Sequence, residues 1–270
     1  MKKFLILLPL LAAFQTSYAV EKLVGTTVSF NTTDPVWPTS GGLSAWAYVG
    51  QVDNPPFAAS GTYLRNGWVL TAAHVGPQVF YLGGNTYNYD GTTQTFGTAD
   101  LRVFHLTTSP NLPDLAISAI PPTPLSAVNP GSQVGMIGYG GGQGETWGLN
   151  TVTAINQIVN STTAFSTRYG NVSAGPNSAN NQYVLIDGDS GGGDFVQQTA
   201  GVYSLVGINL GYDKLTTSQT YLTSYFADLS TYKTQIDAVT ATPEPSTWTM
   251  LGLGGLMGAV VLYRRRRIAE

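Results

Sequence analysis

Two short stretches of this 270-residue chain hold residues that could perform chemistry together. The chain has only two histidines, and one of them, His74, directly follows the apolar run Val-Leu-Thr-Ala-Ala. Far along the sequence, Ser190 lies between glycines in the stretch Asp-Gly-Asp-Ser-Gly-Gly-Gly-Asp. A serine hydroxyl is a weak nucleophile at neutral pH unless a neighbouring base takes its proton. Alone, His74 could equally be a buried imidazole satisfied by a carbonyl, but together the two stretches predict nucleophilic catalysis by Ser190 with His74 as the base.

The glycines around Ser190 indicate a second part of such a site. Glycine adopts turn conformations that a side chain would obstruct, so backbone N–H groups can converge beside the serine hydroxyl. Converging N–H groups stabilise the oxyanion that forms during acyl transfer. We therefore expect the amides of Gly188 and Ser190 to form an oxyanion hole.

An imidazole base also needs an acceptor for the proton on its second nitrogen. Asp114 heads the apolar run in Leu-Pro-Asp-Leu-Ala-Ile-Ser, where a strand would bury it. We predict that Asp114 orients His74. His105 lacks the small-residue surroundings of His74 and is expected to be structural. With two histidines and no cysteine, thiol chemistry is excluded and a zinc site is disfavoured, so no metal is expected.

At this point a family resemblance is evident. The stretches Trp-Val-Leu-Thr-Ala-Ala-His at 68–74, Asp-Leu-Ala-Ile at 114–117 and Gly-Asp-Ser-Gly-Gly at 188–192 resemble, in order, the active-site signatures of the trypsin/chymotrypsin-like serine peptidases. The resemblance extends over residues 45–240. The resemblance implies two packed six-stranded Greek-key β-barrels, with His74 and Asp114 in the first barrel and Ser190 in the second. It also implies that the protein hydrolyses peptides or proteins through an acyl-enzyme intermediate.

The same resemblance suggests which residues shape the specificity pocket. Val184 stands at the position of the pocket base, where relatives that cut after Lys or Arg have an aspartate. Asn209 and Gly211 stand in the segment that lines the substrate. These residues imply a preference for an uncharged side chain before the scissile bond. The family's Gly-Asp-Ser-Gly-Gly-Pro signature reads Gly-Asp-Ser-Gly-Gly-Gly here, and the next residue, Asp194, places an acid four residues after the nucleophile.

The resemblance also raises the possibility of activation by cleavage. In many relatives a freed N-terminal ammonium pairs with the aspartate just before the nucleophile, here Asp189. The stretch Glu-Lys-Leu-Val-Gly-Thr resembles a weak form of the activation site. We hypothesise cleavage between Lys22 and Leu23; an active protein that begins at Val20 or earlier would contradict it.

Composition and patterning indicate the elements that must position these residues. The chain is 43% hydrophobic and 10% charged, with 32 glycines and 15 prolines that break it into short apolar runs. Such runs predict an all-β fold. One exception, at 226–239, places Phe226, Leu229, Ile236 and Val239 on one helical face and predicts a closing helix.

The first 44 residues are expected to lie outside this domain. Residues 1–19 combine Lys2 and Lys3, an apolar run and a small-residue site, which is typical of a signal peptide cleaved after Ala19. Residues 20–44 are polar and turn-rich and predict an irregular arm. The protein is therefore expected to be exported.

The C-terminal segment 241–270 resembles a second known signal. Pro-Glu-Pro at 243–245, an uncharged stretch at 248–263 and four arginines at 264–267 resemble the PEP-CTERM sorting signal of Gram-negative bacteria. That resemblance implies a membrane helix at 248–263, transient tethering to the inner membrane, processing by an exosortase-type peptidase and delivery to the cell surface or extracellular matrix. A permanent single-pass anchor is the alternative.

These observations predict a secreted or cell-surface serine endopeptidase. Between Val20 and Ala241, 6 Lys and Arg oppose 13 Asp and Glu, so the body lacks the basic footprint of a nucleic-acid binder. One alternative is a catalytically silent barrel that binds peptide or polysaccharide outside the cell, although such a protein would typically have lost a triad member. A structural matrix component is a third possibility.

Overall fold

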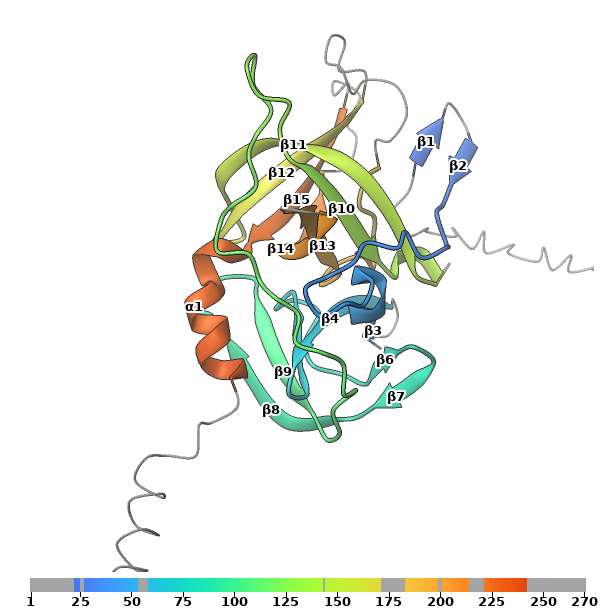
Figure 1. Ribbon diagram of the computed structural model, residues 1–270, viewed down its shortest axis with the longest axis vertical. Helices are drawn as coiled ribbons and strands as arrows, with labels where there is room; N and C mark the ends of the chain where they lie inside the picture. Colours follow the sequence, from blue (N-terminus) through green and yellow to red (C-terminus); the bar gives the residue numbers. More distant parts are fainter. Residues whose placement is uncertain are drawn as a thin grey trace, which may run out of the picture.

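Short strands make up most of the regular structure in the computed structural model of the protein (Figure 1). The structure describes residues 22–24, 27–52, 58–142, 144–170, 183–198, 201–213 and 221–241. Within these ranges, one sheet from the first half of the chain packs against a barrel from the second half, and a helix follows the last strand. The predicted all-β class with a C-terminal helix is confirmed.

The first sheet has seven antiparallel strands in the order β7-β6-β3-β4-β5-β9-β8. They are β3 (Val49–Val52), β4 (Ala59–Arg65), β5 (Trp68–Thr71), β6 (Phe80–Leu82), β7 (Asn85–Tyr87), β8 (Tyr89–Thr95) and β9 (Arg102–Leu106). Its two edges, β7 and β8, are consecutive in the chain and only Asn88 separates them. One bent segment therefore joins both edges, and the sheet is barrel-like. The prediction of six strands is wrong for this half, because the bend at Asn88 divides one long segment into two strands.

The second sheet is a closed barrel of six antiparallel strands in the order β10-β11-β12-β15-β14-β13, as predicted. They are β10 (Gln133–Gly138), β11 (Thr146–Val159), β12 (Thr162–Gly170), β13 (Gly193–Gln197), β14 (Tyr203–Tyr212) and β15 (Tyr221–Asp228). Short 3₁₀ helices occupy Ala45–Tyr48 and Gly140–Gly142. Because β13 starts just after Ser190, the barrel fixes one end of the loop that carries Ser190.

The arm that precedes the first sheet is partly integrated into the core. Its first strands, β1 (Lys22–Val24) and β2 (Thr27–Ser29), pair with each other. Trp37 is buried and stacks on Tyr203 with ring centroids 5.3 Å apart. The ring lies against Gly135, where an added Cβ would come within 2.3 Å of it. Trp37 thus ties the arm to the second barrel.

The closing helix α1 (Leu229–Thr240) begins three residues later than predicted. Phe226 belongs to β15, and the side chain of Asp228 caps the helix by accepting a hydrogen bond from the Ser230 amide at 3.0 Å. Leu229 and Ile236 are fully buried, as the helical pattern predicts.

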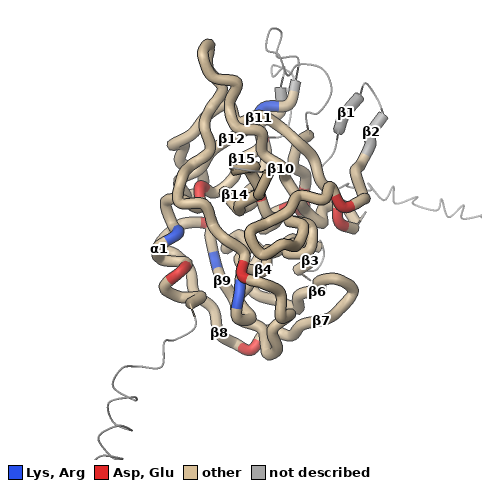
Figure 2. Tube along the Cα trace, viewed as in Figure 1, with Lys and Arg blue, Asp and Glu red and all other residues tan. Residues whose placement is uncertain are grey.

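Polar contacts attach α1 to the first sheet. Arg65 at the end of β4 donates to Asp237 at 3.1 Å, and the Asn66 amide donates to the carbonyl of Thr240 at 3.1 Å. Figure 2 shows basic and acidic residues close together around α1 and β4. α1 therefore packs on the sheet that carries His74.

No helix within the described ranges is long and apolar enough to span a bilayer. The predicted signal peptide at 1–19 and the predicted membrane helix at 248–263 both lie outside those ranges.

Candidate active site

His74 lies just beyond the end of β5, on a segment anchored by its neighbours. Leu70, Thr71 and Ala72 are fully buried, and β5 is paired on both sides, with β4 and β9. The side chain of His74 is 48% exposed. The imidazole therefore reaches the solvent-accessible side of a firmly held strand.

Asp100 is the acid that contacts this imidazole. Its Oδ2 lies 2.7 Å from His74 Nδ1, and its Oδ1 accepts the backbone N–H of His74 at 2.9 Å. The Asp100 side chain is only 8% exposed, and its own N–H donates to Thr162 Oγ1 of the second barrel at 2.7 Å. Two hydrogen bonds to one residue fix both the position and the tautomer of the ring.

The charge of Asp100 follows from these contacts. Burial raises the pKa of its carboxyl, but the hydrogen bonds from the ring and backbone of His74 lower it by more, so the pKa lies below its ordinary value. The carboxyl is thus ionised at neutral pH and can stabilise an imidazolium.

The prediction that Asp114 orients His74 is wrong. The Asp114 side chain is 66% exposed and lies 4.0 Å from Arg65 Nη1, on the side of the sheet where α1 packs. The run that follows it forms no strand: Leu115 donates its N–H to Leu64 O, and Ile117 makes an isolated bridge to Leu205. These contacts bury Leu115 and leave the neighbouring carboxylate outside.

Ser190 lies in a loop of tight turns. The Asp189 N–H donates to Ile186 O at 3.1 Å, and Gly188, third in that turn, has a φ of 99°, which favours glycine. Gly191 has a φ of 89°, and a Cβ there would lie 2.1 Å from Ser60 O. The glycines flanking the serine are thus required by both conformation and space.

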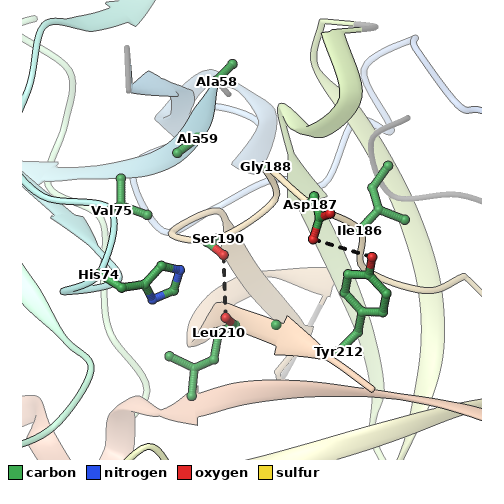
Figure 3. Close-up of a pocket in the computed structure, with 11 residues that line it drawn as sticks. Ala58, Ala59, His74, Val75, Ile186, Asp187, Gly188, Ser190, Leu210 and Tyr212 are labelled. Atoms are coloured by element: carbon green, nitrogen blue, oxygen red, sulfur yellow. Dashed lines mark hydrogen bonds between the residues drawn. The ribbon is translucent and has the colours of Figure 1, made fainter. Parts of the chain in front are cut away.

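His74 and Ser190 line one cavity of about 440 Å³ (Figure 3). Both side chains point into it, from the first sheet and from the loop before β13. The Ser190 hydroxyl donates to Leu210 O at 3.4 Å. The remaining walls are mainly apolar or glycine, with Asp187 and Tyr212 at one side: Ala58, Ala59, Val75, Ile186, Gly188, Leu210 and Gly211.

The predicted oxyanion donors belong to the same cavity lining. In the part of the chain that the structure describes, neither Gly188 N–H nor Ser190 N–H donates to a protein acceptor. Both amides are therefore available to an oxygen atom of a bound molecule.

Only one of the three predicted specificity residues lines this cavity. Gly211 does, whereas Val184 is 1% exposed and packs in the core. Asn209 is fully buried, and its amide donates to the carbonyls of Ile137 and Asp189, both at 3.1 Å. Val184 and Asn209 are thus structural here, because the loop before Ser190 and β14 turn these side chains inward.

Asp189, the predicted partner of a freed N-terminus, is fully buried. Its Oδ1 accepts the Gly140 N–H and its Oδ2 accepts the Ile186 N–H, both at 3.0 Å. Leu23 is paired with Val28 in the β1–β2 hairpin. In the intact chain, backbone amides therefore hold the carboxylate that the ammonium was predicted to hold; cleavage after Lys22 stays a prediction.

Two further buried acids lie near this region. Asp194 in β13 is fully buried, and neither of its carboxyl oxygens has a hydrogen-bond partner in the described residues. Burial raises its pKa well above the ordinary value, and the nearby Asp189 raises it further. Burial also raises the pKa of Glu145 to about 9, although its hydrogen bond from the Tyr139 hydroxyl lowers it and the charge of Asp34 raises it. Glu145 is therefore neutral at pH 7, and burial favours the neutral form of Asp194.

The fold and site define a class of protein: a barrel-like antiparallel sheet packed against a closed antiparallel β-barrel, with Ser190, His74 and Asp100 where the two meet. The family model described as Trypsin matches residues 38–236, so the chain belongs to the trypsin family. A second match, to the PEP-CTERM protein-sorting motif, covers residues 241–267 and indicates an exported protein sorted through the cell envelope. No curated protein matches the chain.

Solved structures of the same fold are distant in sequence. The Rv3671c protease of M. tuberculosis in its active form is 17% identical, with a TM-score of 0.51, over 74% of this chain and 84% of the other. The scabies mite inactivated protease paralogue S-I1 is 19% identical, with a TM-score of 0.50, over 72% of this chain and 94% of the other. The serine endoprotease from Yersinia pestis is 19% identical, with a TM-score of 0.50, over 73% of this chain and 63% of the other. At these identities the likeness concerns the fold.

Proposed function

We propose that this protein is an exported serine endopeptidase in which Ser190 is the nucleophile, His74 the general base and Asp100 the residue that orients the base. The observation that carries the proposal is the buried Asp100 carboxylate 2.7 Å from His74 Nδ1, with the ring and Ser190 lining one cavity. An ionised acid on Nδ1 leaves Nε2 free to accept a proton from the serine.

The reaction follows from these positions. The Ser190 hydroxyl rotates from Leu210 O toward His74, gives its proton to Nε2 and forms an Oγ–C bond to the peptide carbonyl. The carbonyl oxygen becomes an oxyanion that the Gly188 and Ser190 N–H groups stabilise. His74 then protonates the leaving amine as the C–N bond breaks, which leaves an acyl-enzyme.

Hydrolysis of the acyl-enzyme repeats these steps, with water as the nucleophile and Ser190 Oγ as the leaving group. His74 takes a proton from water, whose oxygen attacks the acyl carbon. Collapse of the second tetrahedral intermediate returns the proton to Ser190 Oγ and releases the carboxylate product. No cofactor takes part.

The sorting motif supports the cellular part of the proposal. In this proposal, the predicted signal peptide at 1–19 directs export, and the predicted membrane helix at 248–263 holds the protein transiently in the inner membrane of a Gram-negative cell. An exosortase-type peptidase processes the segment near 243–245 and releases the domain toward the cell surface or matrix.

Two observations favour a second candidate, a silent barrel that binds peptide. The Ser190 hydroxyl is hydrogen-bonded to Leu210 O instead of His74, and one protein of the same fold is an inactivated paralogue. The two candidates differ in whether the hydroxyl can be activated.

Labelling with a fluorophosphonate probe separates the two candidates. We expect the wild type to be labelled, because attack of Ser190 on phosphorus with loss of fluoride requires the same activated hydroxyl. Ser190→Ala and His74→Ala should not be labelled, and Ser204→Ala on β14, outside the cavity, should be labelled like the wild type. A folded wild type that stays unlabelled would favour the binding protein.

A further inference from the structure

Ser60 in β4 belongs to the first sheet, but its polar atoms converge on the loop of the nucleophile. Its N–H donates to Ser190 O at 2.9 Å, and its hydroxyl donates to Gly188 O at 3.0 Å. The same hydroxyl accepts the Tyr139 N–H at 2.9 Å, and its carbonyl accepts the Thr71 hydroxyl at 2.8 Å. Ser60 is fully buried, so water does not compete for these bonds.

The two carbonyl groups that Ser60 binds, at Gly188 and Ser190, alternate along the backbone with the two predicted oxyanion donors. Gly188 N–H belongs to the peptide before residue 188, and Ser190 N–H to the peptide before residue 190. Ser60 holds the carbonyls of the peptides that follow these residues, at Gly188 and Ser190. Since each peptide unit is planar, fixing one restricts the rotation of its neighbours. The hydroxyl of Ser60 therefore limits the directions in which the Gly188 N–H can point.

Close packing makes this restriction narrow. A Cβ on Gly188 would lie 2.6 Å from Ala58 O and 2.8 Å from Gly140 Cα. The turn is thus enclosed by the segment before β4 on one side and by the 3₁₀ helix after β10 on the other. Ser60 Oγ links the turn to the segment that leads into this 3₁₀ helix, because it accepts the Tyr139 N–H and donates to Gly188 O.

We propose that Ser60 is a positioning residue that, through the hydrogen bond from its hydroxyl to Gly188 O, holds the oxyanion donors of the nucleophile loop in place. This assignment rests on the proposed function, since the donors matter only if an oxyanion forms. It assigns to the first sheet a role in acyl transfer beyond that of His74 and Asp100.

Ser60→Ala tests the assignment. Removal of one oxyanion donor lowers kcat about 10²–10³-fold, so loosening one should lower kcat and the rate of fluorophosphonate labelling about 10- to 100-fold. KM for a fluorogenic peptide that the wild type cleaves should change less than about threefold, because ground-state binding is retained. Ser60→Cys keeps a similar side-chain volume and a weak hydrogen-bond donor. Its kcat and labelling rate should therefore lie between those of the wild type and those of Ser60→Ala.

Tyr63→Phe provides the matched control. Tyr63 is 1% exposed on the same strand, and its hydroxyl is bonded to Ser109 Oγ at 2.8 Å, away from the loop. Tyr63→Phe should lower the melting temperature to a similar extent as Ser60→Ala, but its labelling rate should equal that of the wild type. Equal labelling rates in Ser60→Ala and the wild type, with both folded, would overturn the assignment alone. An unlabelled wild type would instead overturn the proposed function, and the assignment with it.

Discussion

Replacement of Asp100 by asparagine is expected to lower kcat about 10⁴-fold, whereas Asp114→Asn should leave kcat within about threefold of the wild type. Asparagine at position 100 would offer His74 Nδ1 an N–H group in place of an ionised oxygen. The ring proton would then move to Nε2, where it prevents the imidazole from accepting the serine proton. Initial rates on a peptide substrate, with the labelling rate as a second readout, measure the difference.

The two variants are a matched pair because each substitution replaces a carboxylate with an amide of the same shape. Melting temperatures establish that both variants fold; Asp114 is exposed and its contact with Arg65 is long, so its loss should be small. A large loss of activity in Asp114→Asn, together with normal activity in Asp100→Asn, would contradict the structural assignment of the acid.

The error over the acid shows where sequence reasoning ends at this site. Two Asp-Leu pairs lie between His74 and Ser190, at 100–101 and 114–115, and each precedes an apolar run. Tertiary contacts separate the two aspartates. Thr162 of the second barrel accepts the Asp100 N–H and holds Asp100 beside His74, whereas Leu64 O accepts the Leu115 N–H, so that Leu115 is buried and Asp114 stays exposed. The run after Asp100 forms β9 and pairs with β5, whereas the run after Asp114 forms no strand, and both facts come from the structure.

The nucleophile loop was more predictable, because its requirements are local. Glycine at 188 and 191 reflects positive φ angles, and these can be expected from the residue type alone. His74 follows from its place at the end of a buried strand. The pocket residues Val184 and Asn209 were inferred by counting along the chain, and counting does not reveal which side of a turn a side chain faces.

The architecture was predictable at the level of layers but less so at the level of strands. The short apolar runs predict the all-β class, whereas the two β units follow from the family resemblance, and the second unit closes with six strands. The bend at Asn88 and the cap at Asp228 shifted two boundaries. Both depend on a single polar residue that a hydrophobic pattern does not register.

Asp194→Asn is expected to stabilise the protein at neutral and alkaline pH and to have little effect near pH 3. Asp194 is fully buried without a hydrogen-bond partner among the described residues, and burial raises its folded-state pKa well above 3.8. Its neutral form is therefore tolerated, and the wild type loses stability as the pH rises from the unfolded-state pKa to the folded-state pKa. The loss accumulates at about 1.4 kcal/mol per pH unit over that window. Urea unfolding at a series of pH values measures the free-energy difference between the two proteins.

Asp90→Asn provides a control of opposite sign. The hydrogen bond from His105 lowers the pKa of Asp90, so this carboxylate stabilises the fold above its unfolded-state pKa and ceases to do so as the pH falls through the folded-state value. Asp90→Asn should therefore reduce stability at pH 7 and approach the wild type in acid. If Asp194→Asn instead destabilised the protein at pH 8, the ionised carboxylate would have a stabilising partner in the folded protein. Asp194, four residues after Ser190, would then stabilise the folded protein in its ionised form instead of destabilising it.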